Sequence, residues 1–328
     1  MKRQIALALL VVLLSADVVV AQTNWYRGNT HTHTINTSGE ASPDVVVRWY
    51  KEHGYHFVVL TDHDSLTPVE GLNAVFAAPG KFLVLAGVEV SDSLERTPVH
   101  LNGIGVRQAV LPQGGASVAD ILNRDARAIR AAGGLPHVDH PNYRWALTAD
   151  DIAAATEIRH FELWNAHPDA HNRGGGSPST EELWDQVLST GRLLYGVATD
   201  NAIYFYGEFS AARANPGRAW IVVQAAELTA DAIVAALDRG DFYATTGVAL
   251  KNYQADERGI RIELSEETGR NAPRYRTYFI GKDGMVLKRD VSLHPSYQFQ
   301  GDELYVRARI EASTGALAWT QPVFVKNK

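Results

Sequence analysis

The chain has 328 residues, of which 45% are hydrophobic and 21% charged, an ordinary composition for a globular protein with a sizeable core. Its formal net charge of −6 at pH 7 disfavours nucleic acid polymers and anionic membranes as partners and leaves small molecules open. The absence of cysteine excludes both a disulfide framework and a lipid-modified cysteine anchor.

The first 21 residues have the pattern of a signal peptide. Lys2 and Arg3 precede an apolar run over residues 5–14, and a small-residue cleavage pattern ends at Ala21. A membrane span needs about 20 apolar residues, and Asp17 interrupts this run too early for one. We therefore predict cleavage after Ala21, no stable membrane anchor, and an exported, periplasmic protein.

From residue 24 to residue 247, strand-like and helix-like segments alternate. Pro43 marks a first helical position, and Ser179 with Glu182 forms a capping box for a later helix. Further helices are expected from about residue 118 and from Thr229 to about Gly240. The expected buried strands are FVVLT (57–61), FLVLAGVEV (82–90), RHFELW (159–164), LLYGVAT (193–199) and AWIVVQ (219–224). This alternation predicts a parallel sheet, open or closed into a barrel.

The helical signals stop after about Lys251. The segment ELYVRARIEA (303–312) alternates apolar with charged residues, and KDG (282–284) is a turn signal between strand-like runs. We therefore expect one α/β domain over residues 22–250 and a small C-terminal antiparallel β domain over residues 251–328.

Two histidines, His31 and His33, lie two residues apart in the segment GNTHTHT (28–34). In an extended strand their side chains point to the same side. Two neutral imidazoles gain little from each other, but both gain from a shared metal ion. An isolated pair of this kind is more often a solvated strand end, so the rest of the chain has to decide.

Several other histidines and carboxylates follow apolar runs. They are Asp62, His63, Asp64, Glu89, His100, His137, His140 and Asp200. In parallel α/β folds the carboxyl ends of the strands form the active-site face. Helix capping could explain one such polar residue after a strand, but it does not explain so many at the carboxyl edge of one predicted sheet.

The constellation resembles the polymerase and histidinol phosphatase (PHP) domain family. The matching motifs, in the order of the family, are THTHT (30–34), LTDHD (60–64), AGVEV (86–90), VHLNGIGV (99–106), DHPN (139–142) and ATDNA (198–202). ALDRGDFYATTG (236–247) and GALAWTQPVF (315–324) resemble an exported subgroup related to carbaryl hydrolase. The resemblance implies a distorted (β/α)7 barrel of PHP type.

The resemblance implies a site for two divalent transition metal ions. It assigns His31, His33, Glu89 and Asp200 to one ion, and His100 and His140 to a second, with Glu89 as the bridge. His137 is the alternative to His140. Imidazole and carboxylate without thiolate suit Zn, Mn or Fe, and a metal-bridging hydroxide would be the nucleophile.

Relatives often hold a third metal, through the histidine that corresponds to His63 and two further ligands. Here Ser38 and Ala202 occupy the other two ligand positions, so we expect no third ion unless His167 or His171 completes the site.

His63 and Asp200 are the predicted catalytic residues. An unligated His63 beside carboxylates is suited to protonate the leaving group. Arg27 and Arg144 adjoin the ligand motifs and are the predicted substrate-binding residues, because a guanidinium matches a phosphate.

These residues predict an exported metal-dependent hydrolase, foremost a phosphoesterase acting on a small molecule. A carboxyl ester, carbamate or amide hydrolase would use the same site, and it gains weight if Arg27 and Arg144 do not face the metals. The alternative of another class is a non-catalytic binding protein that holds metal for structure. The sequence leaves the oligomeric state open.

Overall fold

The computed structural model describes residues 23–265 and 272–326, so the predicted signal peptide lies outside the described residues. The helices are α1 (Pro43–Glu52), α2 (Glu70–Phe76), α3 (Val118–Ala131), α4 (Ala149–Ala154), α5 (Thr180–Ser189) and α6 (Ala230–Arg239). The strands of the α/β part are β1 (Asn24–Asn29), β2 (Phe57–Leu60), β3 (Leu83–Leu94), β4 (Thr97–Ile104), β5 (Leu135–Val138), β6 (His160–Asn165), β7 (Tyr195–Thr199), β8 (Trp220–Ala225) and β9 (Phe242–Thr245).

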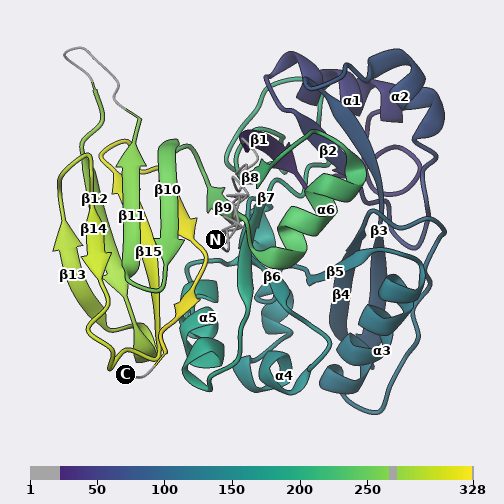
Figure 1. Cartoon of the computed structure of the whole chain (residues 1–328). Helices are drawn as coiled ribbons and strands as arrows, with labels where there is room; N and C mark the ends of the chain where they lie inside the picture. Colours follow the sequence, from purple (N-terminus) through teal and green to yellow (C-terminus); the bar gives the residue numbers. More distant parts are fainter. Residues whose placement is uncertain (1–22, 266–271, 327–328) are drawn as a thin grey trace, which may run out of the picture.

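The C-terminal strands are β10 (Leu250–Asp256), β11 (Gly259–Leu264), β12 (Tyr275–Ile280), β13 (Val286–Asp290), β14 (Ser296–Gln298), β15 (Tyr305–Ala312), β16 (Leu317–Thr320) and β17 (Val323–Phe324). They lie beside the α/β part, at the left of Figure 1. No helix in the described ranges has both the length and the apolar character that a membrane crossing requires.

The helix ends follow local sequence signals. Helix α1 begins at Pro43, as predicted, and the capping box of Ser179 and Glu182 is formed at the start of α5. Helix α6 ends at Gly240, whose φ of +81° is a conformation that glycine adopts without strain. The expected helices over residues 43–52, 118–131, 180–189 and 230–239 are therefore confirmed.

The main sheet is mixed rather than parallel. Strands β1, β2 and β3 are parallel, and so are β5, β6 and β7, but β4 is antiparallel to both β3 and β5. The reason is a β3–β4 hairpin that turns at Glu95, a residue with φ of +55°. The sequence predicted no hairpin at this place.

The described strands form no closed barrel, contrary to the expected (β/α)7 barrel. Strands β1 to β7 are one continuous part of the sheet, and β8 pairs with the free side of β1. Strand β9 pairs with β8 and then with β16, so the sheet continues into the C-terminal strands instead of returning to β7. What the structure supports is a mixed α/β fold with a large open sheet.

The C-terminal strands pair in antiparallel fashion throughout, as predicted. A second sheet of β10, β11 and β14 packs against the main sheet around Ile260, Phe279 and Ile310. Because β16 pairs with β9, these strands share a sheet with the α/β part, and the boundary at residue 250 stays a prediction.

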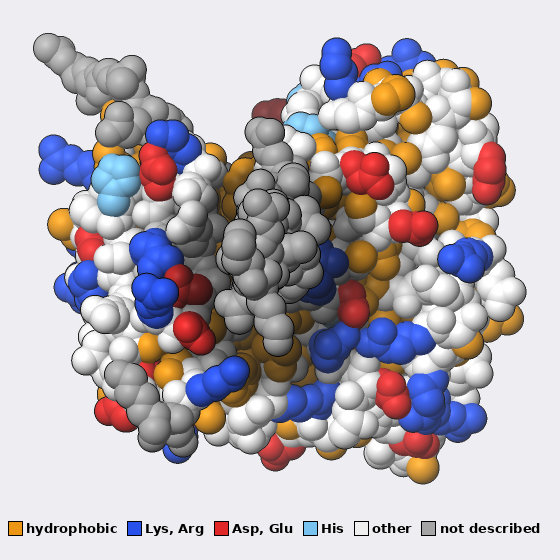
Figure 2. Space-filling model, in the orientation of Figure 1, with side chains coloured by type: hydrophobic (Ala, Val, Ile, Leu, Met, Phe, Trp, Pro, Cys, Tyr) orange, Lys and Arg blue, Asp and Glu red, His pale blue; other side chains and the backbone are white. Residues whose placement is uncertain are grey.

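Strand β15 departs from the predicted alternation of buried and exposed residues. Arg307 is one of the charged residues of that alternation, yet it is fully buried and forms ion pairs with Asp185 and Glu181 of α5. On the face shown in Figure 2, basic and acidic side chains of the described residues are intermixed.

Candidate metal centre

His31 and His33 lie in an extended segment that follows β1. The backbone N–H of His33 donates to the carbonyl of Ala202, and Thr32 and Ala202 form an isolated parallel β-bridge. The two imidazoles point to the same side, as predicted, and their Nε2 atoms lie 3.2 Å apart. Both side chains are buried, so neither is a solvated strand end.

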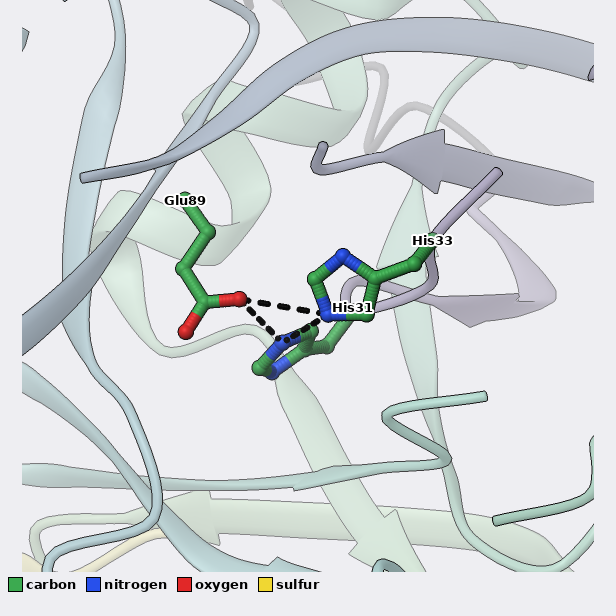
Figure 3. A group of neighbouring side chains, drawn as sticks. All are labelled: His31, His33 and Glu89. Atoms are coloured by element: carbon green, nitrogen blue, oxygen red, sulfur yellow. Dashed lines mark hydrogen bonds and ion pairs between the residues drawn. The ribbon is translucent and has the colours of Figure 1, made fainter. Parts of the chain in front are cut away.

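Glu89 lies between two groups of histidines and offers one oxygen to each. Its Oε2 is 3.1 Å from His31 Nε2 and 3.2 Å from His33 Nε2, the arrangement seen in Figure 3. Its Oε1 is 2.8 Å from His100 Nδ1 and 3.3 Å from His140 Nε2. The β3–β4 hairpin explains why His100 lies near Glu89. His100 pairs with Ser91 across the two strands, and Glu89, two residues before Ser91, lies on the same face of the sheet.

Glu89 belongs to two of the groups of donor atoms that could hold a metal ion. His31, His33 and Glu89 make one, Glu89, His100 and His140 the other, with ligand atoms within 4.8 Å of one another. Nitrogen and oxygen ligands without thiolate suit Zn, Mn or Fe. His140, rather than its alternative His137, is the residue that reaches Glu89.

The electrostatics of the cluster also favour a cation. Burial raises the pKa of Glu89, but His31 and hydrogen bonds from His100 and His140 outweigh it and hold that pKa well below its usual range. Burial lowers the pKa of His31, but Glu162, Glu89 and Asp139 together bring it well above its ordinary value. Without a metal, the cluster therefore attracts a proton to the place where a cation fits.

His63 lies against the first group. Its Nδ1 is 2.7 Å from Ser91 Oγ and 3.3 Å from Glu89 Oε2, and its ring stacks on His33. Burial, only partly opposed by the charge of Glu89, lowers the pKa of His63 to about 4. Its imidazole is then neutral at neutral pH, which suits a ligand or a hydrogen-bond acceptor better than the predicted proton donor.

The residues at the possible third metal site do not all lie together. Ser38 and His167 line the pocket together with His63, whereas Ala202 is buried against the segment of His31 and His33. His171 stacks on Trp145. No candidate ligand group among the described residues includes His63.

Asp200, predicted as a ligand and a catalytic residue, is not brought into the cluster. Its buried carboxylate accepts hydrogen bonds from Tyr50 Oη and from the backbone N–H groups of residues 217, 218 and 219. These four donors occupy the lone pairs that a metal would need. The neighbouring Asn201 contacts the cluster instead, with its Oδ1 3.1 Å from His33 Nε2.

Neither arginine predicted to bind substrate lines the pocket. The Arg27 guanidinium is sandwiched between the rings of Tyr55 and Trp220, 3.9 and 3.7 Å from their centroids. Arg144 is exposed and lies over the ring of Tyr143. Each guanidinium thus has an aromatic partner, and only Arg144 is near the pocket, through the ring of Tyr143 at its wall.

A pocket of about 150 Å³ opens onto both histidine groups. Its lining residues are His33, Ser38, His63, Glu89, His100, His140, Tyr143, His167, Ala170, Asn201 and Ile203. None of them is lysine or arginine, so this pocket offers a substrate no permanent positive charge apart from that of bound metal.

Sequence reasoning missed Glu162, which lies fully buried on β6 and contacts His31. Burial raises its pKa, but the charge and the hydrogen bond of His31 lower it to about 2, so it remains a carboxylate. The signal was present: Glu162 is the only acidic residue in the apolar strand segment RHFELW, and a buried charge needs a partner.

A search against family models found no match, and a search of curated proteins found none either. Among solved structures, a two-domain protein from Bacteroides vulgatus containing a predicted PHP-like metal-dependent phosphoesterase matches with a TM-score of 0.51. The match has 15% identity and covers 92% of this chain and 96% of that chain. At this identity the likeness shows the fold, and it agrees with the PHP-type architecture expected from the motifs apart from barrel closure.

Two further solved structures are less similar. A lesion-specific endonuclease from Pyrococcus furiosus has 14% identity and a TM-score of 0.40, covering 67% of this chain and 57% of that chain. An amidohydrolase from Chromobacterium violaceum has 16% identity and a TM-score of 0.38, covering 57% of this chain and 93% of that chain. At these TM-scores neither similarity bears on the function of this chain.

Proposed function

We propose that this protein is a metal-dependent hydrolase that cleaves a phosphoester bond in a small molecule. The observation that carries the proposal is Glu89, whose two oxygens face two separate groups of histidines. A carboxylate shared in this way is suited to bridge two ions. The Bacteroides vulgatus protein of similar fold contains a predicted metal-dependent phosphoesterase, the activity proposed here.

Two divalent ions held there would supply a nucleophile from water at neutral pH and stabilise charge on both reacting oxygens. The protein's own residues set the ligand geometry and shape the space above it. Tyr143 and Ile203 form apolar parts of the pocket wall, while Asn201 Oδ1 lies 3.1 Å from His33 Nε2, the nitrogen that also faces Glu89.

The size of the pocket supports a small reacting group. Sites for drug-sized ligands usually enclose about 300–1,000 Å³, more than the 150 Å³ found here. A phosphoryl or acyl group fits such a space, with the remainder of the substrate outside it.

A second candidate, hydrolysis of a carboxyl ester, carbamate or amide, is favoured by one observation. Arg27 is held between two rings away from the pocket, and Arg144 lies over Tyr143 without itself lining the pocket, so neither guanidinium is positioned to clamp a phosphate there. A neutral acyl group needs only one site for a developing oxyanion. By the same reasoning, a singly charged phosphodiester suits the pocket better than a doubly charged phosphomonoester.

A matched substrate series tests the proposal. Protein loaded in turn with Zn, Mn or Fe(II) is given 4-nitrophenyl phosphate, bis(4-nitrophenyl) phosphate and 4-nitrophenyl acetate, and Glu89→Gln measures the background. We expect phosphoester turnover that Glu89→Gln abolishes. Turnover of the acetate alone would establish the second candidate, and metal binding without any turnover would favour the non-catalytic binding protein.

The finer assignments follow from sequence motifs. We propose export to the periplasm, membership of the subgroup related to carbaryl hydrolase, and no nucleic acid substrate. N-terminal sequencing of protein from a periplasmic extract should begin at Gln22, and a chain that retains Met1 contradicts export by this signal. Cleavage of a single-stranded oligonucleotide would overturn the substrate assignment.

A further inference from the structure

The Glu162 carboxylate receives four hydrogen bonds and lies behind the ligands. Its Oε1 accepts from His31 Nδ1 at 2.7 Å and from Thr199 Oγ1 at 2.6 Å. Its Oε2 accepts from the backbone N–H of His140 and from Asn165 Nδ2, both at 2.6 Å. All four donors come from the protein, and Glu162 is 0% exposed.

The two oxygens serve two different metal groups. His31 belongs to the group on Glu89 Oε2, and His140 belongs to the group on Glu89 Oε1. Glu162 therefore binds one ligand residue of each group, His31 through Nδ1 and His140 through its backbone N–H. Glu89 contacts the Nε2 atoms of the same two residues.

The contact with His31 fixes which ring nitrogen carries a proton. A carboxylate at Nδ1 keeps the proton there, so the lone pair of Nε2, which faces Glu89 and His33, would be available to a metal ion. Such a carboxylate also makes the imidazole a more basic ligand.

The contact with His140 acts on the backbone. His140 has φ of +25°, in a region that residues other than glycine rarely adopt. The short bond from its N–H to Glu162 holds this conformation, in which the side chain reaches Glu89 Oε1. Strained backbone of this kind persists where its surroundings determine it.

We propose that Glu162 is a positioning residue that couples the two metal sites, so that its loss weakens both ions together. The inference rests on the proposed two-metal site. Glu162 is not itself a ligand, although it lies near His31 and Asp139 in a group that could hold an ion, because its four acceptor positions are taken.

The test measures metal affinity rather than turnover. Glu162→Gln keeps the size of the side chain but removes its charge and turns an NH2 group toward one pair of donors. Competition with a chromogenic chelator should show both zinc dissociation constants rising by roughly 10- to 100-fold. His100→Ala, which removes a ligand of one group, should weaken one ion only.

A spectroscopic signature separates positioning from a general loss of structure. In the zinc-loaded protein, the Nδ1 proton of His31 should resonate far downfield, because it lies in a short bond to a carboxylate. It should move upfield in Glu162→Gln. Asp125→Asn is the matched control, since Asp125 is also a buried carboxylate that accepts a backbone N–H but lies outside the candidate ligand groups; it should leave both constants unchanged.

The outcomes distinguish this inference from the proposed function. Wild-type protein that binds no metal would contradict the proposed function. Wild-type protein that binds two ions while Glu162→Gln binds them equally tightly, or loses only one, would overturn the coupling alone. If Glu162→Gln does not fold, Thr199→Val removes one donor to the same carboxylate: a parallel rise in both constants supports coupling, and a rise in one or neither overturns it.

Discussion

Carboxylates gather in two regions of this molecule, and their partners differ. In the contact between α5 and β15, the buried Asp185 and the half-buried Glu181 meet the guanidinium of Arg307, which approaches Asp185 at 2.6 Å and Glu181 at 2.8 Å. In the pocket region, Glu89 and Glu162 meet imidazoles.

The difference bears on what each region is for. Buried charge is costly unless it is paired. The Arg307 region carries its own permanent cation and is complete as a structural tie between the α/β part and the C-terminal strands. The Glu89 region reaches balance only through a proton or a metal ion, so we assign function to it and stability to the other.

The largest expected effect comes from breaking the Glu89 region. Glu89→Gln removes the carboxylate that faces both groups, so it should lose both ions and nearly all activity. His100→Ala should keep one ion. Elemental analysis and turnover assays on folded protein check this, and full metal content in Glu89→Gln would show that Glu89 is not the bridge.

Breaking the Arg307 region should cost stability instead. Arg307→Met leaves two carboxylates without their buried partner, and removing one member of such a pair costs about 3–5 kcal/mol of unfolding free energy. Arg309→Ala is the control: its side chain is 28% exposed, against 1% for Arg307, so we expect a smaller loss, closer to the ~0–1 kcal/mol of exposed pairs.

Urea unfolding measures both variants of this region. Metal content and turnover per folded molecule should match the wild type. A large loss of turnover with folding and metal content intact would place the C-terminal strands at the active site.

His63 sharpens the comparison, because it is the histidine that touches Glu89 from outside the two ligand groups. The sequence predicted a proton donor, for which His63→Ala would cost most with poor leaving groups. The neutral imidazole held at Ser91 predicts an equal loss for a nitrophenyl ester and an alkyl ester of the same acid. A typical general acid contributes about 100- to 10,000-fold, and a selective loss of that size on the alkyl ester would restore the original assignment.

The last expected effect concerns a carboxylate in neither region. Burial, opposed by the backbone N–H of Gln113 and aided by Asp92, raises the pKa of Asp125 to about 7, against about 3.9 in an unfolded chain. The folded state therefore binds the extra proton between about pH 4 and pH 7, and stability falls as pH rises through this window. Asp125→Asn should remove the part of this decrease in unfolding free energy that is due to Asp125. If the unfolding free energies of variant and wild type fall in parallel with pH, the prediction is contradicted.

Local signals predicted much of the fold. Pro43 and the capping box of Ser179 and Glu182 act within one helical turn, so the sequence placed those helix starts correctly. The β3–β4 hairpin has no glycine or asparagine at its turn residue Glu95, and the sequence could not indicate it. The sheet stays open because β9 pairs with β16, and these two strands lie far apart in the chain. The sequence therefore could not show that the barrel does not close.

The candidate site divides in the same way. His31 and His33 are set by alternation along one strand, and the structure brings them together as predicted. The contacts of Asp200 and Arg307 were not predicted, because their partners lie elsewhere in the chain: backbone N–H groups of residues 217–219 for the first, and Asp185, 122 residues away, for the second. Competing partners of this kind are visible only once the chain is folded.

Metal stoichiometry tests the central claim most directly. Protein purified without chelators and then equilibrated with Zn, Mn or Fe(II) should hold about two equivalents of metal after removal of excess ion, as expected for a two-metal site. Glu89→Gln should hold none under the same conditions. A wild-type protein that retains less than one equivalent, or that holds as much metal as Glu89→Gln, would contradict the claim that the Glu89 region is built around cations.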